Sequence, residues 1–375
     1  MQQLQMVDLK RQYQKIKAEV DTAINHVIEN AAFIGGPDVH SFATELAQYL
    51  GVKHVIPCAN GTDALQIALM ALGLQPGDEV ITPSYTYIAT VEVVALLKLT
   101  PVFVDVDPDT FTMNMESVKK AITAKTKAII PVHLYGQSVN MEPLLAIAKE
   151  HNIAVVEDNA QAIGSTYTFS NGTTVKTGAM GIIGCTSFFP SKNLGGYGDG
   201  GAMFTNDDDL ALKLKMIANH GQQTRYYHEM VGCNSRLDTI QAAVLRIKLR
   251  KLDEYCYSRR QAADYYDKAF KNHPKITTPY RAPYSYHVFH QYTLQISGFD
   301  RDVLQQKLAE RNIPSMIYYP VPSHKQEMLK EYGTASNVLP VTDMLQDCVI
   351  SLPMHTELTE EELAFITNNL IEIIG

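Results

Sequence analysis

Ala128-Ile-Ile-Pro-Val-His133 and Ile153-Ala-Val-Val-Glu157, with a helical pattern from Met141 to Glu150 between them, form the stretch that decides the fold. Both apolar runs are short, continuous and rich in β-branched residues, which is typical of strands buried on both faces of a parallel sheet. The segment between them is long enough for a helical crossover. This unit therefore predicts an α/β fold, with helices covering both faces of a mainly parallel sheet.

The same alternation occurs on both sides of this unit. Further strands are expected at 54–58, 79–83, 101–105, 186–189 and 202–205, which makes a sheet of seven. With an N-terminal arm, these segments predict a large domain at residues 1–250. After Ser235 a long helical pattern runs towards Phe270, and Tyr-, His- and Pro-rich loops then alternate with helices. We therefore expect a smaller α+β domain at residues 251–375, on which a helix from Gln14 to Glu29 could pack.

Composition restricts the class of protein. The chain has 375 residues, a net charge of −8 and no basic block, which argues against nucleic acid or an anionic membrane surface as a partner. No apolar run approaches the ~20 residues of a membrane span, and the N-terminus lacks a signal-peptide core. The five cysteines are scattered, which argues against a disulfide framework and against a metal site of the zinc type. These features predict a soluble cytoplasmic protein.

One lysine stands where an apolar run meets a glycine cluster, in Cys185-Thr-Ser-Phe-Phe-Pro-Ser-Lys192-Asn-Leu-Gly-Gly-Tyr-Gly-Asp-Gly-Gly201. A lysine enclosed in a packed loop is a candidate nucleophile. Asp158 directly follows a buried strand, at the end where α/β sheets place ligands. Pyridoxal phosphate (PLP) needs such a pair, an amine for a Schiff base and a carboxylate for its pyridinium nitrogen. Alone, Lys192 could be a surface residue and Asp158 a helix N-cap.

Other polar residues suit the same cofactor. Gly61 and Thr62 lie at a helix start, where amide groups bind phosphate, although a plain N-cap explains them equally well. Ser187 is either a phosphate donor or a buried strand hydroxyl. Tyr87 either stacks on the cofactor ring or packs in the core. Gln161 either bonds the phenolic oxygen of the ring or lies on a helix surface.

Two arginines and a glycine pattern complete the candidates. Arg225 and Arg236 lie in a polar cluster before a helix, where they suit carboxylate or phosphate recognition or simply form a polar rim. The stretch Gly196–Gly201 formally matches G-x-G-x-x-G. The dinucleotide-binding fingerprint needs a helix after it, whereas a strand-like segment follows here. We therefore reject a Rossmann interpretation.

Taken together, these segments resemble the nucleotide-sugar aminotransferases of the DegT/StrS family, which have the aspartate-aminotransferase fold (PLP fold type I). The resemblance covers essentially the whole chain. It rests on nine ordered matches, at residues 7–13, 33–37, 60–64, 77–83, 157–161, 187–192, 198–201, 219–222 and 234–238.

The resemblance implies a role for each matching position. Lys192 would hold the cofactor through its amine and later move the proton between substrate and cofactor carbons. Asp158 would pair with the ring nitrogen, and Gln161 with the phenolic oxygen. Asn234 would reach the phosphate in the neighbouring subunit's site, which implies a homodimer with shared active sites. The phosphate would otherwise be bound by Gly61, Thr62 and Ser187.

Within this family, the sequence is similar to the enzymes that aminate UDP-2-acetamido-2-deoxy-3-oxo-glucuronate, with glutamate as donor and 2-oxoglutarate as product. Arg236 would be the partner of the sugar carboxylate, and Tyr318 and Tyr319 would also contact the substrate. Relatives often have His before the Tyr-Pro pair, whereas Tyr318 stands here, which bears on the substrate and leaves the reaction class untouched. The family-level setting is the synthesis of surface polysaccharide, including lipopolysaccharide.

Three alternatives belong to the same resemblance. One is a 3- or 4-aminotransferase acting on a dTDP- or GDP-linked keto-deoxysugar. Another is a PLP-bound regulatory relative without turnover. A dehydratase of this family would have His in place of Lys192, so the lysine argues against it.

Overall fold

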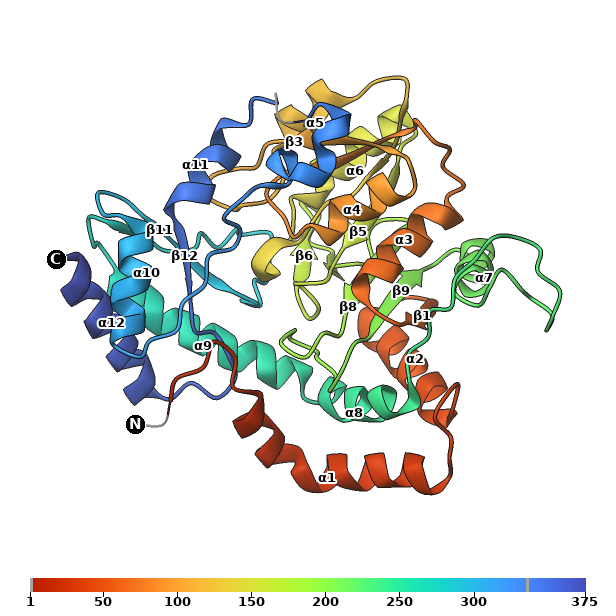
Figure 1. Cartoon of the computed structure of the whole chain (residues 1–375), viewed down its shortest axis with the longest axis horizontal. Helices are drawn as coiled ribbons and strands as arrows, with labels where there is room; N and C mark the ends of the chain where they lie inside the picture. Colours follow the sequence, from red (N-terminus) through yellow and green to blue (C-terminus); the bar gives the residue numbers. More distant parts are fainter. Residues whose placement is uncertain (1–2, 335–336) are drawn as a thin grey trace.

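The computed structural model describes residues 3–334 and 337–375 (Figure 1). Its main feature is a seven-stranded sheet with the order β1-β9-β8-β5-β4-β2-β3. Strand β9 pairs antiparallel with β1 and β8, and the remaining pairings are parallel. This confirms the predicted mainly parallel sheet. The strands are β1 His54–Cys58, β2 Glu79–Pro83, β3 Thr100–Val104, β4 Thr126–Ile129, β5 Ala154–Asp158, β8 Ile183–Ser187 and β9 Gly201–Thr205.

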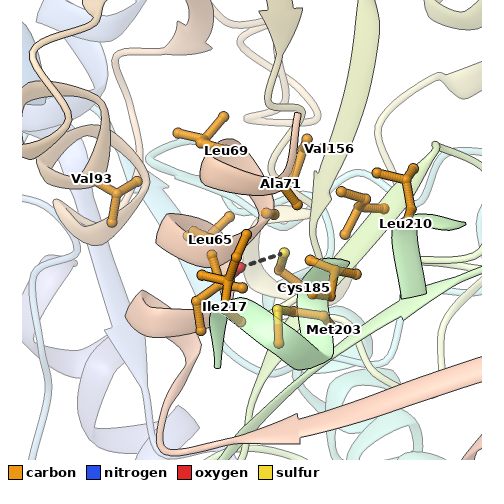
Figure 2. Packing of buried hydrophobic residues seen from close by; sticks show 14 of the residues in the cluster. Leu65, Leu69, Ala71, Val93, Val156, Cys185, Met203, Leu210 and Ile217 are labelled. Atoms are coloured by element: carbon orange, nitrogen blue, oxygen red, sulfur yellow. Dashed lines mark hydrogen bonds between the residues drawn. The ribbon is translucent and has the colours of Figure 1, made fainter. Parts of the chain in front are cut away.

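Helices cover both faces of this sheet, and alternate residues of each strand point to different helices. Met203 packs in the cluster that contains α3 and α7, whereas its neighbours Ala202 and Phe204 pack with α2 and α8. Figure 2 shows the first cluster, in which Leu65 and Leu69 of α3 approach Val156 and Cys185 of the sheet. The helices are α2 Pro37–Leu50, α3 Gly61–Ala71, α4 Ala89–Leu96, α5 Met115–Ala121, α6 Met141–His151, α7 Asp208–Ile217 and α8 Thr239–Leu249.

The C-terminal part has its own sheet and its own apolar cluster. Strands β10 Ile276–Thr277, β11 Tyr292–Ile296 and β12 Val349–Leu352 form an antiparallel sheet. Side chains from this sheet and three helices make one buried cluster. The helices are α9 Leu252–Phe270, α10 Arg301–Glu310 and α12 Glu360–Ile374. A hairpin of β6 Thr166–Thr168 and β7 Thr174–Lys176, and helix α11 Pro340–Cys348, complete the larger elements.

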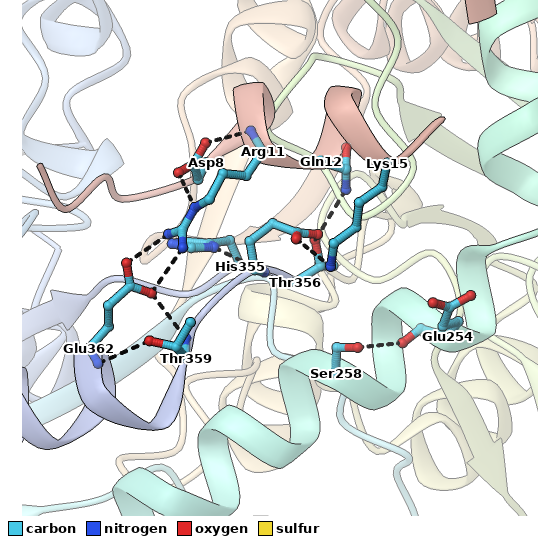
Figure 3. A network of polar contacts seen from close by, with 11 residues as sticks. Asp8, Arg11, Gln12, Lys15, Glu254, Ser258, His355, Thr356, Thr359 and Glu362 are labelled. Atoms are coloured by element: carbon cyan, nitrogen blue, oxygen red, sulfur yellow. Dashed lines mark hydrogen bonds and ion pairs between the residues drawn. The ribbon is translucent and has the colours of Figure 1, made fainter. Parts of the chain in front are cut away.

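Helix α1 Leu9–Glu29 runs along the edge of the molecule and contacts both parts (Figure 1). Leu4, just before it, lies in the C-terminal cluster, whereas Ile16 and Val20 pack on α8. At the C-terminal part, the guanidinium of Arg11 lies 2.9 Å from the carboxylate of Glu362 (Figure 3). The start of the chain therefore contacts the C-terminal part, whereas the middle of α1 packs on α8, which lies before residue 250. The division at residue 250 stays a prediction.

Several expected boundaries were wrong. The single helix expected from residue 235 to Phe270 is two helices, because a tight turn at 250–251 brings the N–H of Lys251 to the carbonyl of Lys248 at 3.0 Å. The strand expected at 186–189 lies at 183–187, since the chain turns away before Pro190. Helix α1 begins at Leu9 because Asp8 caps it by accepting the N–H of Arg11. No helix of residues 3–334 or 337–375 is long and apolar enough to cross a membrane.

Candidate active site

A cavity of about 820 Å³ opens where several parallel strands end. Its walls come from the start of α3, the loop after β2, the ends of β5 and β8, and two segments of the C-terminal part. Most of the residues predicted from the sequence line it, namely Gly61, Thr62, Tyr87, Asp158, Gln161, Ser187, Lys192, Tyr318 and Tyr319.

Three predicted residues do not line this cavity. Asn234, Arg225 and Arg236 are exposed and belong to the segment between α7 and α8. That segment projects from the body of the molecule as the green loop in Figure 1. Within one chain, the structure does not bring these side chains to the site. Their contact with a neighbouring subunit stays a prediction.

Lys192 lies in the loop between β8 and β9. The loop is tight. The backbone N–H of Lys192 donates to the carbonyl of Phe189 at 2.9 Å, and a side chain at Gly195 would lie 2.3 Å from the carbonyl oxygen of Pro190. Burial disfavours the ammonium and lowers the pKa of Lys192 to about 8, although the charge of Asp158 opposes this. A substantial fraction of this amine is therefore neutral near physiological pH.

Asp158 is the last residue of β5 and is only 5% exposed. Burial raises the pKa of its carboxyl group, while two hydrogen bonds favour the anion. The N–H of Ala160 donates to Oδ1 at 3.1 Å, and the hydroxyl of Thr90 donates to Oδ2 at 2.8 Å. Thr90 was not predicted, although its position at the start of the helix after β2 would have been a usable signal.

The start of α3 forms a cradle for an anion. Asn60 caps this helix by accepting the N–H of Asp63 at 2.8 Å, so the amides of Gly61 and Thr62 are the ones that suit a ligand. A side chain at Gly61 would lie 2.7 Å from Cβ of Ser187, so only glycine lets the helix approach the end of β8 this closely. The carboxylate of Asp63, which also lines the cavity, accepts a hydrogen bond from the hydroxyl of Ser235 at 2.6 Å.

The opposite wall is aromatic. Tyr87 is 57% exposed, and its ring centre lies 6.2 Å from that of Tyr319. The amide of Gln161 already has two protein partners, since its Oε1 accepts the N–H of Tyr135 at 2.8 Å and its Nε2 donates to the hydroxyl of Tyr319 at 3.0 Å. A bond from Gln161 to a ligand would use the second amide hydrogen.

His290 and Gln291 also line the cavity and were missed. They lie just before β11 in a Tyr- and His-rich loop, and no local pattern distinguishes them. Burial, with the nearby charges of Lys192 and Arg259, holds the pKa of His290 well below its usual value. Its ring is therefore neutral.

These groups fit PLP. The amine of Lys192 suits the aldehyde of the cofactor, the carboxyl group of Asp158 suits its ring nitrogen, and the amides at Gly61 and Thr62 suit its phosphate. The fit rests on side chains from separate strands that converge on one cavity.

Similarity to known proteins extends over the whole chain. It is 44% identical over 369 residues to a "pleiotropic regulatory protein" of Geobacillus stearothermophilus, covering 98% of this chain and 97% of the relative. It is also 44% identical over 363 residues to UDP-2-acetamido-2-deoxy-3-oxo-D-glucuronate aminotransferase of Pseudomonas aeruginosa, covering 97% and 98%.

A solved structure agrees with these relatives. The crystal structure of NtdA from Bacillus subtilis, with the cofactor PMP bound, matches with a TM-score of 0.92 at 30% identity, covering 100% of this chain and 86% of that one. A family model for the DegT/DnrJ/EryC1/StrS aminotransferases matches residues 14–371. The sheet, the cavity and these matches together show that the chain belongs to the DegT/DnrJ/EryC1/StrS aminotransferase family.

Proposed function

We propose that this protein transfers the amino group of glutamate to the keto carbon of a nucleotide-linked sugar, with PLP held at Lys192. Membership of the family confirms the predicted aminotransferase class and cofactor. The observation that carries the proposal is that the amine of Lys192, in the loop after β8, and the buried carboxyl group of Asp158, at the end of β5, line one cavity.

Each residue has a defined task. PLP, when bound, supplies an electron sink that lets a C–H bond beside the amino nitrogen lose its proton. The Nζ of Lys192, neutral in part because its pKa is about 8, takes that proton and returns it to another carbon. The carboxyl group of Asp158, whose Oδ2 accepts the hydroxyl of Thr90, would pair with the ring nitrogen. The amides at Gly61 and Thr62 hold the phosphate.

The charge of the cavity supports a homodimer with shared active sites. Among the described residues that line it, Lys192 is the only Lys or Arg, whereas Asp63, Asp158 and Asp199 are acidic. The cofactor phosphate, a nucleotide diphosphate and glutamate are all anionic. We therefore infer that Lys or Arg side chains from outside this cavity help to bind them. Arg225, Asn234 and Arg236 are exposed in the segment between α7 and α8, where a second copy could receive them.

That segment also exposes apolar surface. Tyr226 is 75% exposed, Tyr227 70% and Val231 83%. Such side chains on one projecting loop are typical of an interface. We therefore propose that the loop packs on the partner subunit and carries Asn234 towards the partner's phosphate cradle.

The preferred substrate is UDP-2-acetamido-2-deoxy-3-oxo-glucuronate, converted to its 3-amino sugar in the cytoplasm for surface polysaccharide or lipopolysaccharide synthesis. The name of the Pseudomonas relative supports this choice. Arg236 of the partner would pair with the sugar carboxylate. Arg236→Met should then raise KM for this substrate about tenfold or more, whereas Arg250→Met, at an exposed arginine paired with Glu19, should not change it.

A second candidate is a dTDP- or GDP-linked keto-deoxysugar, whose sugar ring carries no carboxylate. It is favoured by Tyr318, a neutral side chain that lines the cavity, and by the scarcity of cations there. A panel of keto sugars, with the new amine located by NMR, separates the two. An Arg236→Met variant that loses nothing on the accepted sugar would favour the substrate without a sugar carboxylate.

The name of the Geobacillus relative raises a regulatory role without turnover. The position of Lys192 favours catalysis, because its amine shares a cavity with the buried carboxyl group of Asp158. Pure protein loaded with PLP and mixed with glutamate should release 2-oxoglutarate in an amount equal to its active sites. Release of no keto acid from glutamate or any other amino acid would contradict the proposal.

A further inference from the structure

The loop that carries Lys192 rests on helix α8 through two polar side chains. The Nζ of Lys248 donates to the carbonyl of Gly195 at 2.8 Å, and Oε1 of Gln241 accepts the N–H of Tyr197 at 2.7 Å. Gln241 and Lys248 lie two turns apart on the same face of the helix. Both contacts therefore reach the loop from one rigid element.

Lys248 is a buried cation without a carboxylate partner. It is 2% exposed, and its Nζ lies 4.8 Å from the centre of the Tyr197 ring. No ion pair joins it to an acidic residue in the part of the chain that the structure describes. Burial lowers its pKa to about 8. An apolar residue of similar size would fill this space without the unfavourable transfer of an ammonium out of water, so stability alone does not explain the lysine.

The contact lies close to the reactive amine along a loop that has little freedom. Gly196 donates its N–H to the carbonyl of Phe188 at 2.8 Å, and Lys192 donates its own to Phe189 at 2.9 Å. The backbone at Gly195 is packed so closely on Pro190 that no side chain fits there. If the carbonyl of Gly195 moves, we therefore expect the backbone of Lys192 to move with it, because the intervening loop has little room to change its conformation.

We propose that Lys248 is a positioning residue, which holds the carbonyl of Gly195 and so keeps the amine of Lys192 directed into the cavity. This inference rests on the proposed function, in which Lys192 is the reactive amine. Lys248 acts through geometry, because the charge that acts on Lys192 is that of Asp158 and not that of Lys248.

The test measures how fast PLP becomes linked to Lys192 in cofactor-free protein, followed by absorbance, with the site confirmed by borohydride reduction and peptide mass spectrometry. Lys248→Met should slow this linkage about tenfold or more, since displacements of about 1 Å have effects of this size. Lys248→Arg keeps a donor and should restore most of the rate. Lys251→Met is the matched control, because Lys251 lies past the end of α8 and is 3.9 Å from Glu254 at the surface.

A second readout separates positioning from general damage. Lys248→Met should unfold near the wild-type temperature, since removal of a buried charge offsets the lost donor to the Gly195 carbonyl, while kcat falls and KM for glutamate changes little. If Lys248→Met does not fold, Lys248→Gln, whose amide stops short of the Gly195 oxygen, should show the same slowing. An unchanged rate of linkage in Lys248→Met would overturn the inference while leaving the proposed function intact. Wild-type protein that never links PLP at Lys192 would refute both.

Discussion

Replacing Thr90 with Val should weaken the anionic state of Asp158. The two side chains are 0% and 5% exposed, and the hydroxyl lies 2.8 Å from Oδ2. A hydrogen bond to a charged group contributes about 1.5–3 kcal/mol, which corresponds to a rise of about 1–2 units in the pKa of Asp158. Valine has nearly the same shape, so it removes the hydroxyl without opening a cavity.

The sign of the effect on stability follows from the state of the carboxyl group. Burial places the pKa of Asp158 in the folded protein above its unfolded value, so the buried anion lowers stability at neutral pH. Loss of the Thr90 bond adds about 1.5–3 kcal/mol to that penalty. This additional loss of stability is complete when the pH is above the pKa of Asp158 in the folded protein. It disappears as the pH falls through that pKa, because the protonated carboxyl group is not stabilised by the Thr90 hydroxyl as the anion is.

Two measurements test this reasoning. Denaturant unfolding of the cofactor-free variant should show a deficit at pH 7.5 that shrinks towards acid pH, and the acid limb of kcat/KM should move up by about 1–2 pH units. Thr90→Ser retains the hydroxyl and should behave like the wild type. The account of Asp158 would be refuted if Thr90→Val and Thr90→Ser had the same acid limb of kcat/KM and if the loss of unfolding free energy in Thr90→Val did not change with pH.

Further variants test other parts of the site. Lys192→Ala should abolish turnover and leave PLP bound only non-covalently, which gel filtration and absorbance would detect; full activity would end the proposal. In cofactor-free protein, the rate at which an amine reagent modifies Lys192 should rise with pH about a midpoint near 8, and a midpoint above 10 would contradict its burial. Gly61→Ala should lower PLP affinity about tenfold or more by pushing α3 from Ser187, as equilibrium titration would show. Glu157→Leu should destabilise the fold by about 3 kcal/mol or more in denaturant melts, because three backbone N–H groups lose their buried acceptor.

Much of the fold was predictable because buried parallel strands have a plain signature. Continuous β-branched runs placed β2, β3 and β5 to within a residue or two. Helix α2 was missed although its signals were present, with Pro37 at its first position and Gly51 in a left-handed conformation after its end. The break between α8 and α9 had no such signal, since good helix formers continue through the turn at 250–251.

The residues of the candidate site likewise include some that the sequence predicted and some that it did not. Asp158 and Lys192 were found because each comes at or soon after the end of an apolar run, and ligands bind at the carboxyl ends of the strands in such sheets. His290 and Gln291 come from the C-terminal part, and only tertiary packing brings them to the cavity. The two partners of Gln161 were equally invisible, since one is the N–H of Tyr135, whose backbone is left-handed with φ of 57°, and the other is the hydroxyl of Tyr319 in the C-terminal part.

Strand β1 has one neighbour in the sheet, β9, and the pairing joins His54 to Thr205 (Figure 1). On the ribosome, β1 therefore emerges long before its partner is made, and closing so long a loop delays its docking. The phosphate cradle at Gly61 follows β1, and Lys192 precedes β9. Both halves of the cofactor site consequently become fixed in one late step of synthesis, and a nascent chain that ends before residue 205 should not retain PLP.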